Sequence, residues 1–400
     1  MRVTDLMALV TTTITPQASV ETMMADIGAA LGGHGVFTRV MSYAPAAPNE
    51  PLLHALIIAM RDSGLAGFML DCNAKSDMVL EQRGGEVVTI HDGWNLPLVG
   101  FMVDHPAHHI PHLQRAPRKG LITVIDEDHL RFIADLGIKA AGRIFCPHGG
   151  PLPIPTQRDA ADRPIDLLFI GNVEAESPTG AWLDGTSAGD AGLRTALAEA
   201  HDAVREDGIE LYAALIAAFG RAGRDTSALA LARFVQALDA HIARSRRLEM
   251  LQAIRSRRVT ILGNVNPAAA GVLAHHDLRG PATFATALSQ MAKAKLLLNS
   301  RVTFSGGAHE RLFYGLSRGA VAVTEPSRFL APDLAGGFGM VALPKAQTDI
   351  DHMVDGLLAD MAGIDALRER GLPHYARHHS WAERTGRILD SLVETGLVPA

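Results

Sequence analysis

Short β-rich segments alternate with helical or loop segments through the N-terminal part of the chain, and this alternation constrains the fold more than any other feature. Strands that are separated by helices usually pair in parallel, in a sheet whose faces are covered by helices. We therefore predict an α/β domain at the N-terminus. Its expected strands are Val36–Tyr43, Gly67–Leu70, Glu86–Ile90, Leu98–Val103, Leu121–Ile125 and Arg143–Cys146.

The proline-rich segment 147–164 interrupts this pattern. Prolines lack a backbone N–H and disfavour both helices and central strands, so we place the domain boundary here. A second α/β series follows, and helical spacing over residues 191–257 predicts several helices between its first two strands, forming a subdomain. The expected strands of this series are Asp166–Ile170, Arg258–Leu262, Gly271–Ala274, Lys295–Leu298, Ala320–Thr324 and Gly339–Leu343.

Together these patterns predict an α/β protein with two Rossmann-like domains that face a cleft. A chain of 400 residues, 48% of them hydrophobic, is long enough for two cores. We expect an N-terminal domain over residues 1–155 and a C-terminal domain over 156–375, the latter with a helical insertion at about 185–257. By analogy with two-domain enzymes, residues 376–400 are expected to form a helix that crosses back to the N-terminal domain.

Composition excludes several classes of protein. The net charge of −6 and the pI near 6.3 give no overall basic surface, so nucleic acid is not an expected partner. The two cysteines, Cys72 and Cys146, argue against a disulfide framework and fit a reducing compartment. Residues 1–16 lack the pattern of a signal peptide, and no run of about 18 apolar residues predicts a transmembrane segment. We expect a cytoplasmic protein.

The segment 295–328 is the most informative for function, because it combines a strand, a glycine-containing loop, a helix and a second strand. The loop precedes a helix that is expected to begin near Ala308. Backbone N–H groups in the first turn of a helix are unpaired and attract anions, and glycines let the backbone approach a ligand closely. His309 and Arg311 add donors for phosphate or sugar hydroxyls. These features suit a nucleotide diphosphate; the alternative on spacing alone is an ordinary connecting loop that binds no phosphate.

The strand after this helix points to the same place. Gly319 is a candidate C-cap, and residues 320–324 form a buried strand whose carboxyl end delivers Thr324 and Glu325 to the same crevice. The residues predicted to line this binding site are Ser305, Gly306, Gly307, His309, Glu310, Arg311, Tyr314, Thr324 and Glu325.

Residues 306–325, GGAHERLFYGLSRGAVAVTE, resemble the donor-site signature of the CgeB-like (spore-maturation-type) family of bacterial GT-B glycosyltransferases. Three further segments also resemble this family: DLLFIG at 166–171, residues 291–299, and HSWAER at 379–384. The resemblance extends over most of residues 165–390.

The resemblance implies a hexosyltransferase-type, metal-independent enzyme that needs no cofactor. Its C-terminal domain would hold a UDP-, GDP- or dTDP-linked sugar, and its N-terminal domain would receive the hydroxyl of a protein, glycan or small molecule. The sequence departs from the family at Tyr314, where many relatives carry a carboxylate that holds the ribose. Glu310 is our first choice to replace that carboxylate, and Glu325 is the second. The remaining alternatives are that the donor is held differently or that this branch never used the carboxylate.

A polar cluster follows the apolar strand at 98–103, where a doubly wound sheet presents its functional loops. Asp104 and His105 are the catalytic candidates, because either can act as a general base for an acceptor hydroxyl. Asp104-His105-Pro106 also resembles an Asp-x-Pro arrangement of related sequences. The alternative is that both residues only stabilise a turn.

The histidines of this segment have spacings that would suit a metal, but prolines interrupt any helix and no cysteine accompanies them, so we expect no metal site. These histidines are His105, His108, His109 and His112.

Two other functions fit the same pattern. The Tyr314 departure suggests a catalytically degenerate module of GT-B fold that binds a nucleotide or a protein. A sugar-nucleotide epimerase or a phosphorylase would share the fold, and a phosphorylase would need a cofactor lysine, for which Lys293 and Lys295 are the candidates.

Overall fold

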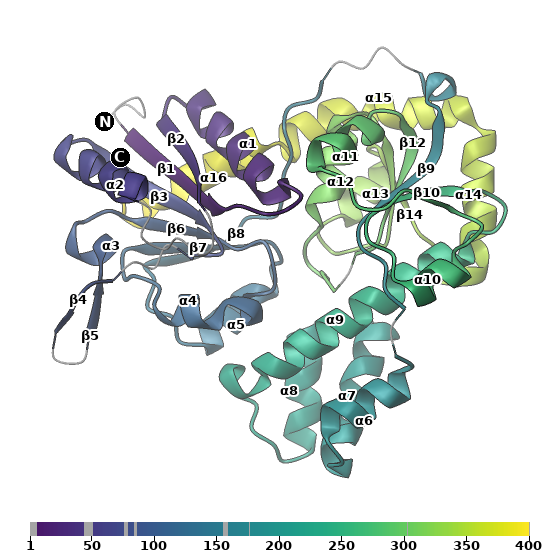
Figure 1. Cartoon of the computed structure of the whole chain (residues 1–400), viewed down its shortest axis with the longest axis horizontal. Coiled ribbons are helices and arrows are strands. Elements are labelled where there is room, and N and C mark those ends of the chain that lie inside the picture. The colour runs from purple at the N-terminus through teal and green to yellow at the C-terminus, as the bar shows by residue number, and fades with distance from the viewer. Residues whose placement is uncertain are drawn as a thin grey trace. The chain divides into compact units, whose positions relative to one another are not determined.

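The computed structural model describes residues 6–43, 51–75, 79–83, 86–154, 159–175, 177–301 and 303–399. Part of the predicted boundary segment, residues 155–158, lies outside the described residues, as do residues 1–5. The chain forms two compact units, each with its own parallel sheet (Figure 1). Unit 1 comprises residues 1–152 and 379–400, and unit 2 comprises residues 153–378.

Unit 1 is built on a six-stranded parallel sheet in the order β2-β1-β3-β6-β7-β8. The strands of the unit are β1 Leu6–Thr13, β2 Phe37–Tyr43, β3 Ala66–Cys72, β4 Val79–Arg83, β5 Glu86–Thr89, β6 Leu98–Phe101, β7 Gly120–Val124 and β8 Gly142–Phe145. Its helices are α1 Ser19–Gly33, α2 Pro51–Asp62, α3 Ile90–Gly93, the 3-10 helix η2 Pro106–His109, α4 Ile110–Gln114, α5 His129–Asp135 and α16 Trp381–Glu394.

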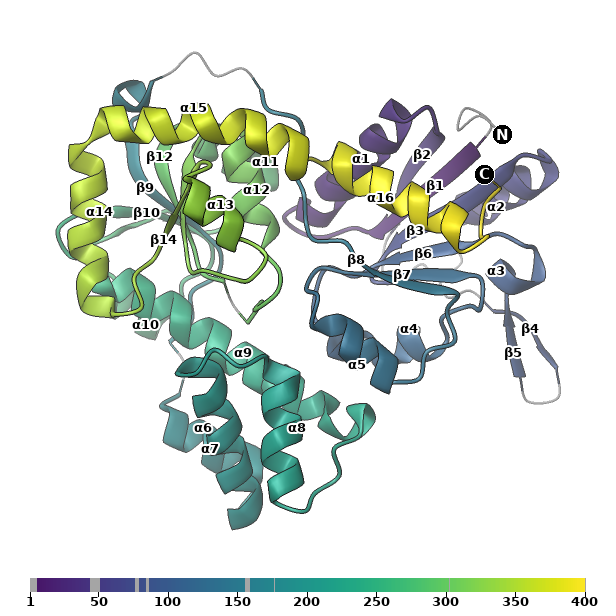
Figure 2. The same cartoon turned by 180° about the vertical axis from the view of Figure 1, so that it is seen from behind.

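Side chains alternate between the two faces of this sheet, and each face is covered by helices. Ala8 and Val10 of β1 pack in one core with α1 and α16, whereas Leu9 packs on the other face with α2. Figure 2 shows α16 alongside α1, although the two helices are far apart in the sequence. Trp381 at the start of α16 is 1% exposed and meets Phe101 edge to face at 5.8 Å. The last helix is therefore part of the unit 1 core.

Two features of unit 1 differ from the sequence prediction. Strand β1, the partner of both β2 and β3, was not among the predicted strands; its three threonines are β-branched and suit a strand. The strand predicted at Glu86–Ile90 pairs antiparallel with β4 in a separate hairpin, and Ile90 already begins α3. The other predicted strands of this half are confirmed as β2, β3, β6, β7 and β8.

Unit 2 contains a second six-stranded parallel sheet, in the order β11-β10-β9-β12-β13-β14. Its strands are β9 Ile165–Ile170, β10 Val259–Leu262, β11 Asp277–Leu278, β12 Ala294–Asn299, β13 Val321–Thr324 and β14 Met340–Ala342. Its helices are α6 Thr179–Ser187, α7 Ala191–Arg205, α8 Leu211–Arg221, α9 Ala228–Ala253, α10 Pro267–Val272, α11 Phe284–Met291, α12 Glu310–Ser317, α13 Ala331–Gly336, α14 Ile350–Ala359 and α15 Met361–His378, with 3-10 helices η3 Ala160–Asp162 and η4 Gln347–Asp349.

Helices α6 to α9 form a helical layer between β9 and β10, within unit 2 (Figure 1). Three of them begin at a side chain that accepts from the backbone N–H groups of the first turn: Asp190 for α7, Glu210 for α8 and Ser227 for α9. The helices predicted between residues 191 and 257 are therefore present. The long helix α9 runs from this layer back to the sheet, where its last turns join the core of unit 2.

The strand predicted at Gly271–Ala274 is wrong. Its first two residues, Gly271 and Val272, end α10, whose N-cap is Asn266 and whose first residue is Pro267. The Asn266 side chain accepts from the N–H of Ala269 at 2.8 Å. An asparagine followed by proline is a helix-start signal that outweighs the apolar character of the segment. The edge strand is β11, further along the chain.

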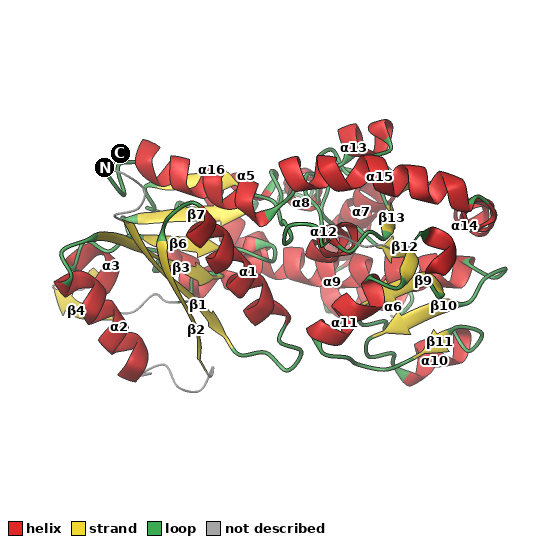
Figure 3. Cartoon of the chain, turned by 90° about the horizontal axis from the view of Figure 1, so that it is seen from above, coloured by secondary structure: helices red, strands yellow, loops and turns green. Residues whose placement is uncertain are grey.

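Both units are doubly wound sheets, so the prediction of an α/β fold with two Rossmann-like domains is confirmed (Figure 3). Such sheets bind ligands at the carboxyl ends of the strands where the strand order reverses. This switch point lies between β1 and β3 in unit 1 and between β9 and β12 in unit 2. Among the described helices, none is both long and apolar enough to span a membrane.

Candidate functional site

The backbone comes unusually close to itself at the switch point of unit 2. Gly171 follows β9 and Gly263 follows β10, with φ angles of +150° and +152°. A Cβ atom on Gly263 would lie 2.2 Å from the carbonyl oxygen of Gly171, so no other residue fits there. At these two glycines the loops thus meet backbone to backbone, and the side of Gly171 that a Cβ would occupy faces Arg311 in the first turn of α12.

Arg311, in the first turn of α12, reaches this backbone. Its guanidinium nitrogens lie 3.3 Å from the position that a Cβ on Gly171 would take, and its Cζ lies 5.6 Å from the ring centre of Phe169. The residue is 6% exposed, and Nη1 is buried without a hydrogen-bond partner among the described residues. Burial lowers the pKa of Arg311 to about 9, and the neighbouring Arg247 lowers it as well. The buried guanidinium of Arg311 therefore makes only part of its possible hydrogen bonds with the protein.

His309 and Glu310 hold this guanidinium in place. Nη2 of Arg311 donates to Nε2 of His309 at 3.0 Å, and Nδ1 of His309 lies 2.6 Å from a carboxylate oxygen of Glu310. Burial and the charge of Arg311 lower the pKa of His309 to about 4, so the ring is neutral at pH 7. Because a guanidinium can only donate, Nε2 is the acceptor of this bond. Nδ1 lies beside the Glu310 carboxylate and also 3.4 Å from the backbone N–H of Arg311, for which it is the N-cap acceptor. The three side chains form one hydrogen-bonded chain from carboxylate to guanidinium.

Two neighbouring arginines of α9 approach the same edge of the sheet. Arg247 donates from Nη1 to the carbonyl oxygen of Asn172 at 3.4 Å, and burial lowers its pKa. Sequence reasoning assigned this stretch to helices and missed both residues. A signal was present, since Arg246 lies one turn from Ile242 and one turn from Met250, both buried. A cation at a core position of a helix indicates a functional or paired group.

The loop and helix predicted to bind the sugar donor are close to their expected places. Ser305, Gly306 and Gly307 are buried in the loop before α12. The helix begins at Glu310 rather than near Ala308, and His309 is its N-cap residue. Gly319, with a φ of +73°, follows the C-cap residue of this helix.

Tyr314 lies apart from these residues. It is fully buried and packs edge to face on Phe284 at 5.0 Å, within a core cluster on the sheet. The side chain that stands in place of the expected carboxylate is therefore part of the core.

Thr324 and Glu325 lie at the carboxyl end of β13. Asn299 donates from Nδ2 to the Thr324 hydroxyl at 2.9 Å, which ties the ends of β12 and β13 together. The Glu325 carboxylate accepts from the backbone N–H of Arg301 at 2.9 Å and lies 3.7 Å from Nε of Arg246. Thr324 thus supports the strand ends, whereas Glu325 faces the arginines.

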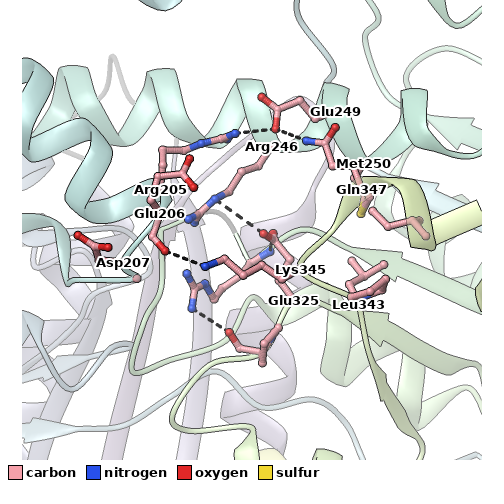
Figure 4. A pocket seen from close by; sticks show the side chains of 15 residues that line it. Arg205, Glu206, Asp207, Arg246, Glu249, Met250, Glu325, Leu343, Lys345 and Gln347 are labelled. Carbon is pink, nitrogen blue, oxygen red and sulfur yellow. Dashed lines mark hydrogen bonds and ion pairs between the residues drawn. The ribbon is translucent and has the colours of Figure 1, made fainter.

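A cavity of about 350 Å³ opens next to Glu325, between the helical layer and the ends of the strands (Figure 4). Residues from α7, α9 and the segments after β12, β13 and β14 contribute to its wall. The charged side chains among them are Arg205, Arg246, Glu249, Arg301, Glu325 and Lys345, with Glu206 and Asp207 also lining it.

In unit 1, Asp104 follows β6 near the carboxyl edge of the sheet. Its carboxylate lies 3.2 Å from Nε2 of His109 and 3.5 Å from Nδ2 of Asn73, and its side chain is 56% exposed. Asp104 and His109 therefore form an accessible carboxylate–imidazole pair. Sequence reasoning missed this pairing, which depends on the short helix η2 turning the chain back after Pro106.

His105 is placed differently from Asp104. It is 4% exposed, its Nδ1 accepts from the N–H of Ala107 at 3.1 Å, and its ring packs against His129 at 4.3 Å and Phe132 at 5.1 Å. The side chain caps η2 and joins the layer beneath it, so it is less accessible to a substrate than Asp104.

The structure also shows where the candidate metal-binding histidines and the candidate cofactor lysine lie. Within the described residues, no single metal-ligand group contains the histidines considered above, since His105 caps η2 and His109 pairs with Asp104. Lys295, the candidate cofactor lysine, lies on β12 and pairs with Asp166 at 2.6 Å.

No protein-family model matches the sequence, and no curated protein matches it. Solved structures that resemble the whole chain include WaaG, a glycosyltransferase involved in lipopolysaccharide biosynthesis (13% identity, TM-score 0.48, covering 96% of this chain and 99% of that chain). Others are Anabaena Alr3699/HepE in complex with UDP and glucose (10%, 0.49, 97% and 99%) and AviGT4, a glycosyltransferase involved in avilamycin A biosynthesis (13%, 0.47, 99% and 98%).

Proposed function

We propose that this protein is a GT-B glycosyltransferase that binds the diphosphate of a nucleotide sugar at the switch point of unit 2. The buried, partly unpartnered guanidinium of Arg311 beside Gly171 carries this proposal. Burying a charged group with one donor unpaired costs free energy, and a perturbed charged group of this kind is a candidate for binding a ligand that completes its hydrogen bonds. A diphosphate supplies the missing acceptors and charge.

Arg311 and Arg247 are suited to a diphosphate more than to a neutral ligand. Arg311 is buried and Arg247 is half-buried at the same edge of the sheet, and each has one buried nitrogen without a partner among the described residues: Nη1 of Arg311 and Nε of Arg247. Arginine forks bind phosphate oxygens in pairs, and the glycine loops let the backbone approach them. Glu310, whose carboxylate already accepts from His309, is our candidate for the ribose hydroxyls.

The same groups would promote transfer. When an acceptor hydroxyl oxygen attacks the anomeric carbon, the bond from that carbon to the diphosphate oxygen breaks and the diphosphate leaves with added negative charge. Fixed guanidinium groups in a site shielded from water stabilise that charge, so no metal ion is required. We assign the general base to Asp104, which takes the proton of the hydroxyl, with His109 orienting the carboxylate.

The test is calorimetric binding of UDP, GDP, dTDP and their common sugar conjugates, with thermal stabilisation as a second readout. One nucleotide should bind to the wild type, and Arg311→Gln and Arg247→Gln should each weaken it. Arg257→Gln is the control, because Arg257 precedes β10, at its amino end, and pairs with Asp355 at 2.6 Å. Silence across the panel would refute the proposal.

Turnover assays separate the three related functions. Transfer or slow hydrolysis of the bound sugar nucleotide supports the glycosyltransferase. Binding without turnover supports the degenerate module, and isomerisation of the sugar supports an epimerase.

A further inference from the structure

The cavity beside Glu325 is a candidate for a second binding site. Its volume of about 350 Å³ is at the lower end of the range, about 300–1,000 Å³, that holds small ligands in proteins. Figure 4 shows Arg205, Arg246 and Lys345 reaching it from three separate segments. Such convergence of cations from distant parts of the sequence is costly without a purpose.

Cations outnumber carboxylates in the less exposed part of the wall. Three guanidinium groups, from Arg205, Arg246 and Arg301, face two carboxylates. Glu249 lies 2.7 Å from Nη2 of Arg205, and Glu325 lies 3.7 Å from Nε of Arg246. Arg301 instead donates from Nη1 to the carbonyl oxygen of Pro326 at 2.8 Å. One guanidinium charge is therefore left without a carboxylate.

The hydrogen bonds of the cluster are also incomplete. Nη1 of Arg205 and Nε of Arg301 are buried and have no partner among the described residues. Burial lowers the pKa of Arg246 to about 10, and the charges of Arg301 and Arg205 lower it further, against the opposite effect of Glu325. The three guanidinium groups thus repel one another, and an added anion would relieve this repulsion.

The rim of the cavity indicates what kind of anion fits. The exposed Lys345 donates one hydrogen bond, to the carbonyl oxygen of Glu206 at 3.0 Å. An ammonium group has three N–H donors, so it can still bind a ligand at the mouth of the cavity. The exposed carboxylates of Glu206 and Asp207 lie at the same rim. They disfavour a highly charged ligand such as a second diphosphate, and they accept hydrogen bonds from hydroxyl groups. A ligand with one carboxylate and several hydroxyl groups therefore suits the residues that line the cavity.

The cavity shares a wall with the proposed diphosphate site. Arg246 and Arg247 are consecutive on α9, yet Arg247 contacts Asn172 at the end of β9 whereas Arg246 faces Glu325 at the end of β13. One turn of α9 therefore serves two adjacent sites on the same sheet edge. A ligand group near the diphosphate would be within reach of the cavity.

We propose that this cavity binds the carboxylate of an acidic sugar of the uronate type. The inference rests on the proposed function and names its substrate class. The carboxylate can come from the sugar donor or from an acidic acceptor, and the two sources are distinguished by experiment.

The first experiment compares calorimetric binding of UDP, UDP-glucose and UDP-glucuronate to the wild type, Arg205→Gln and Lys345→Gln. Arg221→Gln is the matched control, since Arg221 also pairs with a glutamate of the helical layer, Glu199 at 2.9 Å, but lies outside the cavity. Titration of free glucuronate, with and without UDP, is the second arm. Thermal melting verifies that every variant is folded.

If the sugar donor is acidic, UDP-glucuronate should bind about tenfold tighter than UDP-glucose, as expected for a charge-assisted hydrogen bond. Arg205→Gln and Lys345→Gln should remove this preference and leave the affinity for UDP unchanged. If the acceptor is acidic, the two donors bind equally, and free glucuronate binds to the wild type but about tenfold more weakly to the variants.

Equal binding of both donors together with no binding of free glucuronate overturns the proposal. Binding that is the same in the wild type and in both variants overturns it as well. If UDP and its conjugates do not bind at all, the proposed donor is wrong, while the titration of glucuronate alone still tests the cavity.

Discussion

Replacement of Arg311 by methionine should change stability and nucleotide binding in opposite directions. Methionine has a similar unbranched shape but no charge, so it fills the space without a cation to solvate. The apo protein should become more stable, and the affinity for the nucleotide should fall. A residue kept for packing alone would not produce this combination.

The magnitudes follow from the surroundings of Arg311. Burial lowers its pKa well below the ordinary value of an arginine, to about 9, and one pKa unit corresponds to about 1.4 kcal/mol, so the buried charge is disfavoured by on the order of 5 kcal/mol. The lost hydrogen bond to His309 and imperfect packing offset much of this gain. We expect a net stabilisation of about 1–2 kcal/mol, or about 2–8 °C in Tm for a unit of this size.

The loss of binding is calculated from the contact that the charge would make. A hydrogen bond between a charged donor and a phosphate contributes about 1.5–3 kcal/mol, which corresponds to a Kd about 10 to 150 times higher. Differential scanning fluorimetry of the apo protein gives the first quantity, and calorimetry with the nucleotide selected from the panel gives the second. Arg257→Met, at the other end of the sheet, should leave the nucleotide affinity unchanged.

The reasoning would be refuted by an Arg311→Met protein that melts at a lower temperature and binds the nucleotide as well as the wild type does. That result would make Arg311 a structural residue of unit 2. A protein that loses both stability and binding would show that the chain from Glu310 through His309 to Arg311 stabilises the fold more than burial of the charge opposes it.

Four other predictions can be tested on the same protein. Gly263→Ala should destabilise unit 2 by about 1–3 kcal/mol and weaken nucleotide binding, because its Cβ would meet the Gly171 carbonyl; an unchanged urea midpoint would contradict this. Asp104→Asn should lower kcat of transfer by about 100-fold or more and spare nucleotide affinity, so a normal kcat excludes it as the base. Between pH 6.5 and about 4, His309 takes up a proton in the unfolded chain but not in the folded one. The free energy of unfolding should therefore fall by up to about 1.4 kcal/mol for each unit by which the pH is lowered. Urea titrations at several pH values measure this dependence, which His309→Gln should make weaker. Trp381→Ala should cost about 3–5 kcal/mol in unit 1, measured by chemical denaturation, and a change below 1 kcal/mol would show that α16 is not part of that core.

The sequence predicts the fold well where local patterns and tertiary packing agree. Most strands are buried apolar runs between helical segments, and they form as expected. The prediction fails where two local signals compete. Strand β1 contains polar threonines as well as apolar residues, and the apolar run at 271–274 suggests a strand although Asn266 and Pro267 start a helix just before it. In both cases the pairing or capping partner, rather than the hydrophobicity of the run, decides the structure.

The site is less predictable, because its parts come from distant segments. The loop before α12 and Arg311 can be inferred from one stretch of sequence. Arg247 cannot, since α9 lies about 60 residues before α12 in the chain and only the tertiary fold brings it to Asn172. Gly171 is equally ambiguous on its own, because its role depends on the close approach of Gly263.

The position of α16 affects the order in which the two units can fold during synthesis. Unit 1 begins the chain, but its core includes Trp381, Ile388 and Leu392, which leave the ribosome only after all of unit 2. Until then the face of the unit 1 sheet beside α1 lacks one of its two helices. Unit 2, whose residues are contiguous, can complete its core first, so the N-terminal unit should be the last to mature and the one that most needs protection from aggregation during synthesis.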